Sequence, residues 1–202
     1  MKLYFITSNT HKFSEAIKKL EPDGIEIEQL KLDYPEIQAD TNEDIMSYGM
    51  EWIIEYYGDK IDQPFIIEDA GLFVHSLNNF PGVYSKFVYK TIGPQGILDL
   101  LAMKNNDEDR VAHFEACLGY YDPTDPDSNK KPKILKGICN GIIATKVRGT
   151  RGFGYDPIFM PVSTDSTFGE MSVEDKNQYS HRSRVLGKLR DYLTETGKIV
   201  NK

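Results

Sequence analysis

The sequence predicts an α/β protein with a mixed β-sheet, and three observations lead to that fold class. Short apolar runs in the first half alternate with segments of helical periodicity, as at residues 3–6 and 13–20. Two long apolar runs, at residues 111–121 and 134–144, follow each other across a polar, proline-containing connection, which predicts a hairpin. Because alternation favours parallel strands and hairpins are antiparallel, both kinds of pairing are expected in the sheet.

The first part of the chain predicts strand, helix, strand and helix in turn. Residues 3–6 suit a buried strand, and residues 13–20 carry apolar side chains at helical spacing until the sequence EPDG ends the helix. Alternating residues at 25–30 predict a second strand. The next helix is expected to begin near Thr41, because Thr41 and Asp44 have the spacing of a capping box.

The middle and the end of the chain predict one further strand and two helices. Residues 64–69 form a compact apolar run that ends on two carboxylates, and residues 76–87 are loop-like around a Pro-Gly turn. Residues 93–104 predict a helix with proline in its first turn. The last helix is expected to start at about His181, capped by Ser180.

Composition limits the classes of function. The chain has 202 residues, of which 40% are hydrophobic, which suits a single domain, residues 1–202, organised as two lobes. The formal net charge of −7 argues against a nucleic-acid partner, because affinity for phosphate backbones needs massed Lys and Arg. No run approaches the roughly 18 apolar residues of a membrane span, and the N-terminus lacks a signal-peptide pattern. We therefore expect a cytoplasmic protein without a membrane partner.

The polar segment TSNTHK, Thr7–Lys12, joins the first strand to the first helix. A loop that enters a helix N-terminus offers unpaired backbone N–H groups and the positive end of the helix dipole, which together bind anions. The hydroxyl groups and the Lys12 ammonium add donors. The same segment also suits a polar entry loop in which Ser8, Asn9 or Thr10 merely caps the helix.

Two adjacent carboxylates, Glu68 and Asp69, close the predicted strand 64–69. Adjacent carboxylates repel each other unless a cation lies nearby, and Mg²⁺ prefers oxygen ligands of this kind. Glu36, in the loop after the second strand, can supply another ligand. A solvated acidic strand end is the alternative interpretation.

The segment RGFGYDPIF, residues 151–159, places Gly152 and Gly154 around Phe153. Glycines permit close backbone approach, and an exposed aromatic ring offers a face on which a base can stack. An ordinary glycine-containing turn with core aromatics is the alternative.

Lys176, His181 and Arg182 gather where the last helix is expected to begin. Positive charge there opposes the helix dipole, at a cost of roughly 0.3–1 kcal/mol for each charge, so a bound anion would explain the placement. Lys86 is a further cation in the predicted loop 76–87.

Six motifs, taken in order, resemble those of the inosine triphosphate pyrophosphatase family, also called the Ham1-like family, and of its archaeal-type members in particular. They are TSNTHK, PEIQ, FIIEDAGL, FPGVYSKF, GFGYDPIF and TFGEMSVEDKNQYSHRS, and they extend over essentially the whole chain. The resemblance implies an elongated mixed sheet with two α/β lobes around a central cleft, and a homodimer.

The resemblance also implies an activity, which is hydrolysis of ITP, dITP and XTP to the monophosphate and pyrophosphate with Mg²⁺ as cofactor. It makes Asp69 the proton acceptor and places Mg²⁺ on Glu36 and Asp69, with Glu68 beside them. Thr7–Lys12 are expected to cradle the triphosphate and the later residues to contact phosphate, sugar or base. The substrate-binding residues it implies are Thr7, Ser8, Asn9, Thr10, His11, Lys12, Ala70, Lys86, Phe153, Gly154, Tyr155, Asp156, Lys176, His181 and Arg182.

Two positions depart from the family pattern: Ser8 stands where the first motif usually has glycine, and Gly49 aligns with a basic residue of some members. Two other functions stay open, a nucleotide-binding protein without catalysis and a pyrophosphatase of ordinary or modified nucleotides. The carboxylate set argues against the first, and the GFGYD and SHR segments argue against the second. All the implied site residues are expected to share one cleft.

Overall fold

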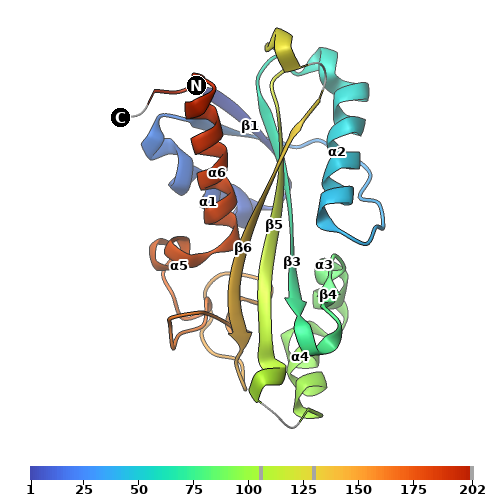
Figure 1. The fold of residues 1–202 in the computed structure, drawn as a ribbon, viewed down its shortest axis with the longest axis vertical. Helices are drawn as coiled ribbons and strands as arrows, with labels where there is room; N and C mark the ends of the chain where they lie inside the picture. Colours follow the sequence, from blue (N-terminus) through green and yellow to red (C-terminus); the bar gives the residue numbers. More distant parts are fainter. Residues whose placement is uncertain (105–106, 129–130, 201–202) are drawn as a thin grey trace. The chain divides into compact units, whose positions relative to one another are not determined.

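The computed structural model describes residues 1–104, 107–128 and 131–200, and it has the predicted α/β architecture (Figure 1). Within the described residues, seven strands form one sheet in the order β2-β1-β3-β5-β6-β7, with β4 paired to β3. The strand β1 pairs in parallel with β2 and β3, whereas the pairs β3–β4 and β6–β7 are antiparallel. The prediction of a mixed sheet is confirmed.

The elements alternate along the chain much as the periodicity predicts. The strands are β1 (Lys2–Ile6), β2 (Glu26–Leu30), β3 (Phe65–Val74), β4 (Phe80–Gly82), β5 (Val111–Tyr121), β6 (Lys133–Ile143) and β7 (Phe159–Pro161). The α-helices are α1 (Thr10–Leu20), α2 (Asn42–Tyr57), α3 (Ser85–Thr91), α4 (Gly93–Ala102), α5 (Val173–Tyr179) and α6 (His181–Glu195). None of the helices in the described part of the chain is long and apolar enough to cross a membrane.

The chain divides into two compact units. Unit 1 comprises Met1–Asp69, Ala116–Gly137 and Ser183–Lys202, and unit 2 comprises Ala70–Glu115 and Ile138–Arg182. Strands β3, β5 and β6 contribute residues to both units, and one boundary falls directly after Asp69. The organisation of residues 1–202 as one domain with two lobes around a cleft stays a prediction.

Unit 1 is a sheet with helices on both faces. Phe65, Ile66 and Ile67 are all buried, as expected for a parallel strand covered on both sides. Phe65 and Ile67 pack with Met46, Met50 and other residues of α2. Figure 1 shows α2 on one side of these strands and α1 and α6 on the other. This packing fixes β3 up to Asp69.

The N-terminus of α2 confirms the capping prediction. Thr41 Oγ1 accepts a hydrogen bond of 3.1 Å from the Asp44 N–H and donates to Asp44 Oδ2 at 2.6 Å. Residues 31–41, which include Glu36, form neither helix nor strand. The cap therefore ends an irregular segment at a defined position.

Unit 2 has a separate core, in which strands β3, β5 and β6 pack against α4 and the segment after β6. Its members include Leu72, Leu98, Phe114, Phe159 and Phe168, all of them buried. The pairing of β4 with β3 requires glycine, because a Cβ on Gly71 would lie 2.4 Å from the Gly82 carbonyl oxygen. Two backbones can approach this closely only without a side chain between them.

Three local predictions were wrong. Strand β3 does not end at Glu68 and Asp69 but continues to Val74, because Leu72 and Val74 enter the core of unit 2. The expected loop 76–87 contains β4 and the start of α3, so Lys86 lies on a helix. Lys176 does not lie at the start of the last helix either, because it belongs to the separate helix α5.

Candidate functional site

The loop Thr7–Lys12 is organised by Asn9. The Asn9 side-chain oxygen accepts hydrogen bonds from the backbone N–H groups of His11 (3.0 Å) and Lys12 (3.1 Å). The Asn9 N–H itself donates to Thr7 Oγ1 at 3.1 Å. The helix-cap interpretation of this segment is therefore right for Asn9.

The same loop keeps donors available beside the cap. Gln29 of β2 holds it in place by donating from Nε2 to the Thr7 carbonyl at 2.8 Å, and the Thr7 N–H donates to Leu30. Within the described part of the chain, the backbone N–H groups of Ser8 and Thr10 have no hydrogen-bond partner. Two donors at the positive end of α1 can therefore serve an anion.

Lys12 connects this loop to the two carboxylates of β3. Its Nζ lies 2.9 Å from the Glu68 carbonyl oxygen, 3.0 Å from Glu68 Oε2 and 3.7 Å from Asp69 Oδ1. The Glu68 side chain is 1% exposed, whereas that of Asp69 is 39% exposed. Glu68 is thus the buried partner of Lys12, and Asp69 is the carboxylate that solvent or a ligand can reach.

Glu36 lies in the same electrostatic neighbourhood. Burial raises the pKa of Tyr34, and the negative charges of Asp69, Glu36 and Glu68 raise it further, in that order. All three predicted metal ligands are therefore close enough to one phenol group for their charges to act on it. The sequence analysis missed Tyr34, although its place two residues before Glu36 could have drawn attention to it.

The carboxylates are of the kind that Mg²⁺ binds, and a magnesium ion at this place stays a prediction. Among the described residues, no group of three His, Cys, Asp or Glu side chains is close enough to form a complete cage for a metal. Mg²⁺ usually needs no such cage, because it binds through one or two carboxylates together with phosphate oxygens and water. Glu36 and Asp69 offer oxygen donors of the right kind.

In unit 2, Asp156 organises the glycine-containing segment. Its Oδ2 accepts hydrogen bonds from the Phe153 N–H and from Lys176 Nζ, each at 2.8 Å. The Lys176 and Asp156 side chains are both 4% exposed. A buried carboxylate thus accounts for the position of Lys176, for which the sequence had suggested an anionic ligand.

Gly152 is required for this arrangement. Its φ of +73° lies in the left-handed region, and a Cβ at this position would lie 2.0 Å from Asp156 Oδ2. Any side chain here would both strain the backbone and displace the carboxylate. Gly154 also has a positive φ, of +64°, but its Cβ position is open.

The Phe153 ring lies between basic groups. Lys176 Nζ is 5.1 Å and Arg182 Cζ is 5.4 Å from the ring centroid, within the range of cation–π contacts. Arg182 is 2% exposed, and the ring of the buried His181 stacks on Phe114 with centroids 4.6 Å apart. These basic side chains are fixed by aromatic contacts before any ligand binds.

Tyr155 confirms the alternative interpretation of its segment. The side chain is 3% exposed, belongs to the core of unit 2, and donates from its hydroxyl to the Ser85 carbonyl at 3.1 Å. Its ring is therefore a structural element. Phe153 is only half-buried and keeps the role of the aromatic ring that can contact a ligand.

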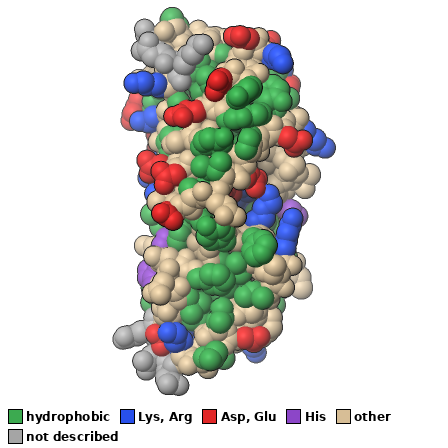
Figure 2. Space-filling view, turned by 90° about the vertical axis from the view of Figure 1, so that its right-hand side faces the viewer, with side chains coloured by type: hydrophobic (Ala, Val, Ile, Leu, Met, Phe, Trp, Pro, Cys, Tyr) green, Lys and Arg blue, Asp and Glu red, His purple; other side chains and the backbone are tan. Residues whose placement is uncertain are grey.

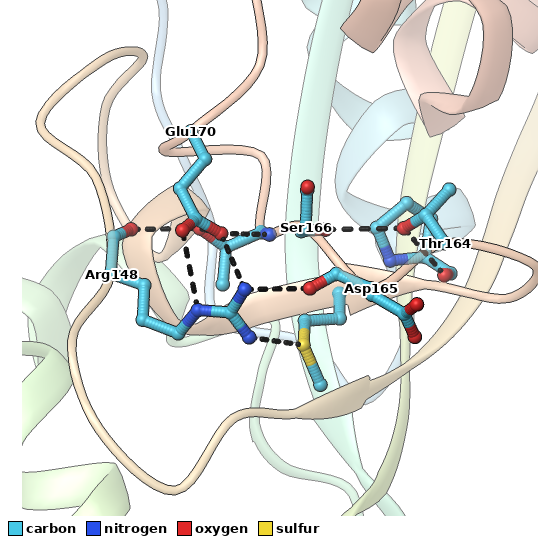
Figure 3. A network of polar contacts seen from close by, with 8 residues as sticks. Arg148, Thr164, Asp165, Ser166 and Glu170 are labelled. Carbon is cyan, nitrogen blue, oxygen red and sulfur yellow. Dashed lines mark hydrogen bonds and ion pairs between the residues drawn. The ribbon is translucent and has the colours of Figure 1, made fainter.

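A network around Arg148, which no motif in the sequence indicates, holds the segment that precedes Gly152 (Figure 3). Arg148 donates from Nη2 to the Asp165 carbonyl at 2.6 Å and forms an ion pair of 3.0 Å with Glu170. Glu170 in turn accepts from the Thr167 N–H at 2.8 Å, and this bond, together with Arg148, holds the pKa of Glu170 below its ordinary value. The network joins two loops of unit 2.

The predicted residues thus form two local groups. In unit 1, Thr7–Lys12, Glu68 and Asp69 lie together, with Glu36 in their electrostatic neighbourhood. In unit 2, Phe153, Asp156, Lys176 and Arg182 are in contact. Ala70 follows Asp69 as the first residue of unit 2, and Lys86 is exposed on α3. The sharing of one cleft by both groups stays a prediction.

Comparison with known sequences gives consistent results over the whole chain. A sequence model described as the Ham1 family matches residues 3–192. A dITP/XTP pyrophosphatase of Thermococcus kodakarensis is 48% identical over 195 residues, which are 96% of this chain and 98% of the relative. A dITP/XTP pyrophosphatase of Methanothermobacter marburgensis is 44% identical over 200 residues, 99% of this chain and 100% of the relative.

Solved structures show the same similarity in three dimensions. A HAM1 protein from Coxiella burnetii has a TM-score of 0.77 at 28% identity and covers 96% of this chain and 99% of its own. The Staphylococcus aureus Ham1 protein has a TM-score of 0.75 at 26% identity, and the match covers 97% of this chain and 100% of the Staphylococcus aureus protein.

Proposed function

The chain belongs to the Ham1 family, and from this premise we propose that it hydrolyses the non-canonical purine nucleotides dITP, XTP and ITP to the monophosphate and pyrophosphate. Relatives named dITP/XTP pyrophosphatase, at 44–48% identity over nearly the whole chain, support this substrate class. The contact of Lys12 with Glu68 and Asp69 carries the proposal, because it places an exposed carboxylate beside a phosphate-binding loop.

The reaction is an in-line attack of water on the α-phosphorus. Water oxygen forms the new bond to phosphorus, the bond from the α-phosphorus to the bridging oxygen breaks, and pyrophosphate leaves. Asp69 accepts the proton of the attacking water, a contribution worth roughly 10²–10⁴ in rate for a positioned base. The Ser8 and Thr10 N–H groups and the Lys12 ammonium stabilise negative charge on the phosphates.

Glu36 and Asp69 would hold Mg²⁺, with Glu68 next to them as the partner of Lys12. When bound, the ion would offset negative charge on the substrate oxygens and fix their position. The rest of the cradle is supplied by the loop before α1. This division gives the two adjacent carboxylates different tasks, in agreement with their different exposure.

The residues of unit 2 would bind the base. Inosine and xanthosine carry a 6-oxo acceptor where adenosine has an amino donor, so a fixed donor such as Arg182 rewards the oxo group. Discrimination of this kind reaches about 10⁴–10⁵ where a site is built for hydrogen bonding. Phe153 offers a ring face to the purine, and its two basic neighbours hold that ring in place.

We also propose that the enzyme acts in the cytoplasm as a homodimer. Helix α3 and its N-cap expose large hydrophobic side chains, with Tyr84 45% and Phe87 68% exposed. Figure 2 shows hydrophobic side chains gathered on the face of the molecule that it presents. Exposed apolar patches of this kind often mark protein interfaces, and sedimentation of the protein tests the pairing.

Product analysis tests the reaction. With dITP and Mg²⁺ in water labelled with ¹⁸O, the label is expected in dIMP, because water attacks the α-phosphorus. Inorganic pyrophosphate should appear in equal amount, and chelation of Mg²⁺ should stop both. Formation of dIDP with labelled inorganic phosphate would contradict the proposed chemistry.

A further inference from the structure

The Tyr34 side chain has a defined packing position in unit 1, here called the notch, between Gly49 of α2 and Ile67 of β3. Tyr34 itself lies in a segment without helix or strand. Its ring is half-buried and packs with the core cluster that includes Ile67 of β3. A Cβ built on Gly49 of α2 would lie 3.0 Å from Tyr34 Cε2 and 3.1 Å from Ile67 Cδ1. The absence of a side chain at Gly49 is thus what makes room for the ring.

The notch connects the irregular segment 31–41 to the strand that carries the carboxylates. Ile67 directly precedes Glu68 and Asp69, and Glu36 follows Tyr34 by two residues. The ring therefore fixes the backbone next to Glu36 against the backbone next to Asp69.

We infer that Tyr34 is a positioning residue for the acidic group Glu36–Asp69, and that Gly49 is small so that Tyr34 can take this place. By packing against Ile67, the ring holds the backbone beside Glu36 next to the strand that carries Asp69. The inference rests on the proposed binding of Mg²⁺ by Glu36 and Asp69. It assigns Tyr34 no contact with the reacting atoms.

Two variants test the position of the ring. Tyr34→Phe keeps the packing beside Gly49 and removes only the hydroxyl. Gly49→Ala places a Cβ 3.0 Å from the ring, which must then move, while alanine is the better helix former within α2. Tyr48→Phe is the matched control, because Tyr48 precedes Gly49 on α2 and its side chain is 40% exposed.

The experiment measures binding of Mn²⁺, as a spectroscopic probe for the divalent ion, to the protein without nucleotide, together with the Mg²⁺ concentration for half-maximal dITP hydrolysis. Loss of an outer contact to metal ligands typically weakens metal binding by about 10–100-fold. We expect a weakening of about 10-fold for Gly49→Ala, with unchanged melting temperature and unchanged turnover at saturating Mg²⁺. Tyr34→Phe keeps the ring and should bind the ion as the wild type does. Tyr48→Phe should match the wild type.

Wild-type ion binding in Gly49→Ala would overturn the inference, whether or not its melting temperature falls. Equal losses of ion binding in Gly49→Ala and Tyr34→Phe would also overturn it, because they would assign the effect to the hydroxyl. Failure of the proposed function is distinguishable from either result. In that case the wild-type protein itself would not hydrolyse dITP, or would do so without a divalent ion.

Discussion

The Lys12 ammonium lies 3.0 Å from the Glu68 carboxylate, and that carboxylate is almost completely buried. Lys12 belongs to α1 and Glu68 to β3, so the pair joins the proposed phosphate-binding loop to the strand of the proposed catalytic carboxylate. A buried carboxylate is stable only with a partner. The pair therefore links the stability of unit 1 to the geometry of the proposed site.

Lys12→Met should destabilise the protein by about 3 kcal/mol, because it leaves the buried Glu68 charge without its partner. Urea unfolding at pH 7 measures the change. Lys18→Met on the exposed side of the same helix is the control and should change the free energy of unfolding by no more than about 0.5 kcal/mol. Equal effects of the two substitutions would contradict a structural role for the pair.

Asp69→Asn should lower kcat by roughly 10²–10⁴ while the KM for dITP changes far less, because the amide cannot accept a proton from water. Steady-state kinetics at saturating Mg²⁺ provide the measurement. Asp62→Asn, an exposed aspartate in unit 1, is the matched control and should behave as the wild type. A variant Asp69→Asn with wild-type turnover would exclude Asp69 as the base.

Gly152→Ala and Gly154→Ala should differ sharply although both glycines have positive φ. Alanine at residue 154 meets open space, so the expected cost is the left-handed backbone alone, about 1–2 kcal/mol. Alanine at residue 152 collides in addition with Asp156, which should release Lys176 and Phe153. Thermal unfolding and the KM for dITP should both show the larger effect at residue 152. Indistinguishable variants would argue against Asp156 as the organising residue.

Lys198 supplies a test of pH dependence away from the site. It forms an ion pair of 2.6 Å with Asp122. Burial by itself would raise the pKa of Asp122, but hydrogen bonds from Lys198 and Thr124 outweigh it and hold that pKa below its ordinary value. A carboxyl pKa that is lower in the folded state stabilises that state at pH values above the unfolded pKa of about 3.9. This contribution to stability is lost as the pH falls from about 3.9 through the lower pKa of the folded state.

Lys198→Met should therefore reduce stability at pH 7 by about 1–2 kcal/mol and have a smaller effect below about pH 4. Denaturant unfolding at several pH values measures the difference from the wild type. Lys146→Met, at an exposed lysine, should show a difference near zero throughout. A difference for Lys198→Met that grows as the pH falls would have the wrong sign for this ion pair.

The sequence predicted local structure well where the signal was local. The capping box of Thr41 and Asp44 and the alternation in β2 depend on neighbouring residues, and both predictions are confirmed. The end of β3 was misplaced because two charged residues resemble a strand end. The partner that makes Glu68 tolerable inside the strand, Lys12, lies 56 residues away in the chain.

The candidate site shows the same limit. The residue types were recognisable from their motifs, but the partners of Lys176 and Arg182 depend on the turn at Gly152 and on packing around Phe153. Tyr34 had no motif of its own, because its position follows from the space beside Gly49. Such contacts arise from tertiary packing and leave no periodic pattern in the sequence.

The most direct test is pyrophosphate release with Mg²⁺ from dITP, XTP, dGTP and dATP, measured side by side with the same protein. The account predicts that kcat/KM for dITP and XTP exceeds that for dATP and dGTP by at least about 100-fold, as expected for a site built on hydrogen bonds to the base. Equal values for all four nucleotides, or no pyrophosphate from any of them, would contradict it.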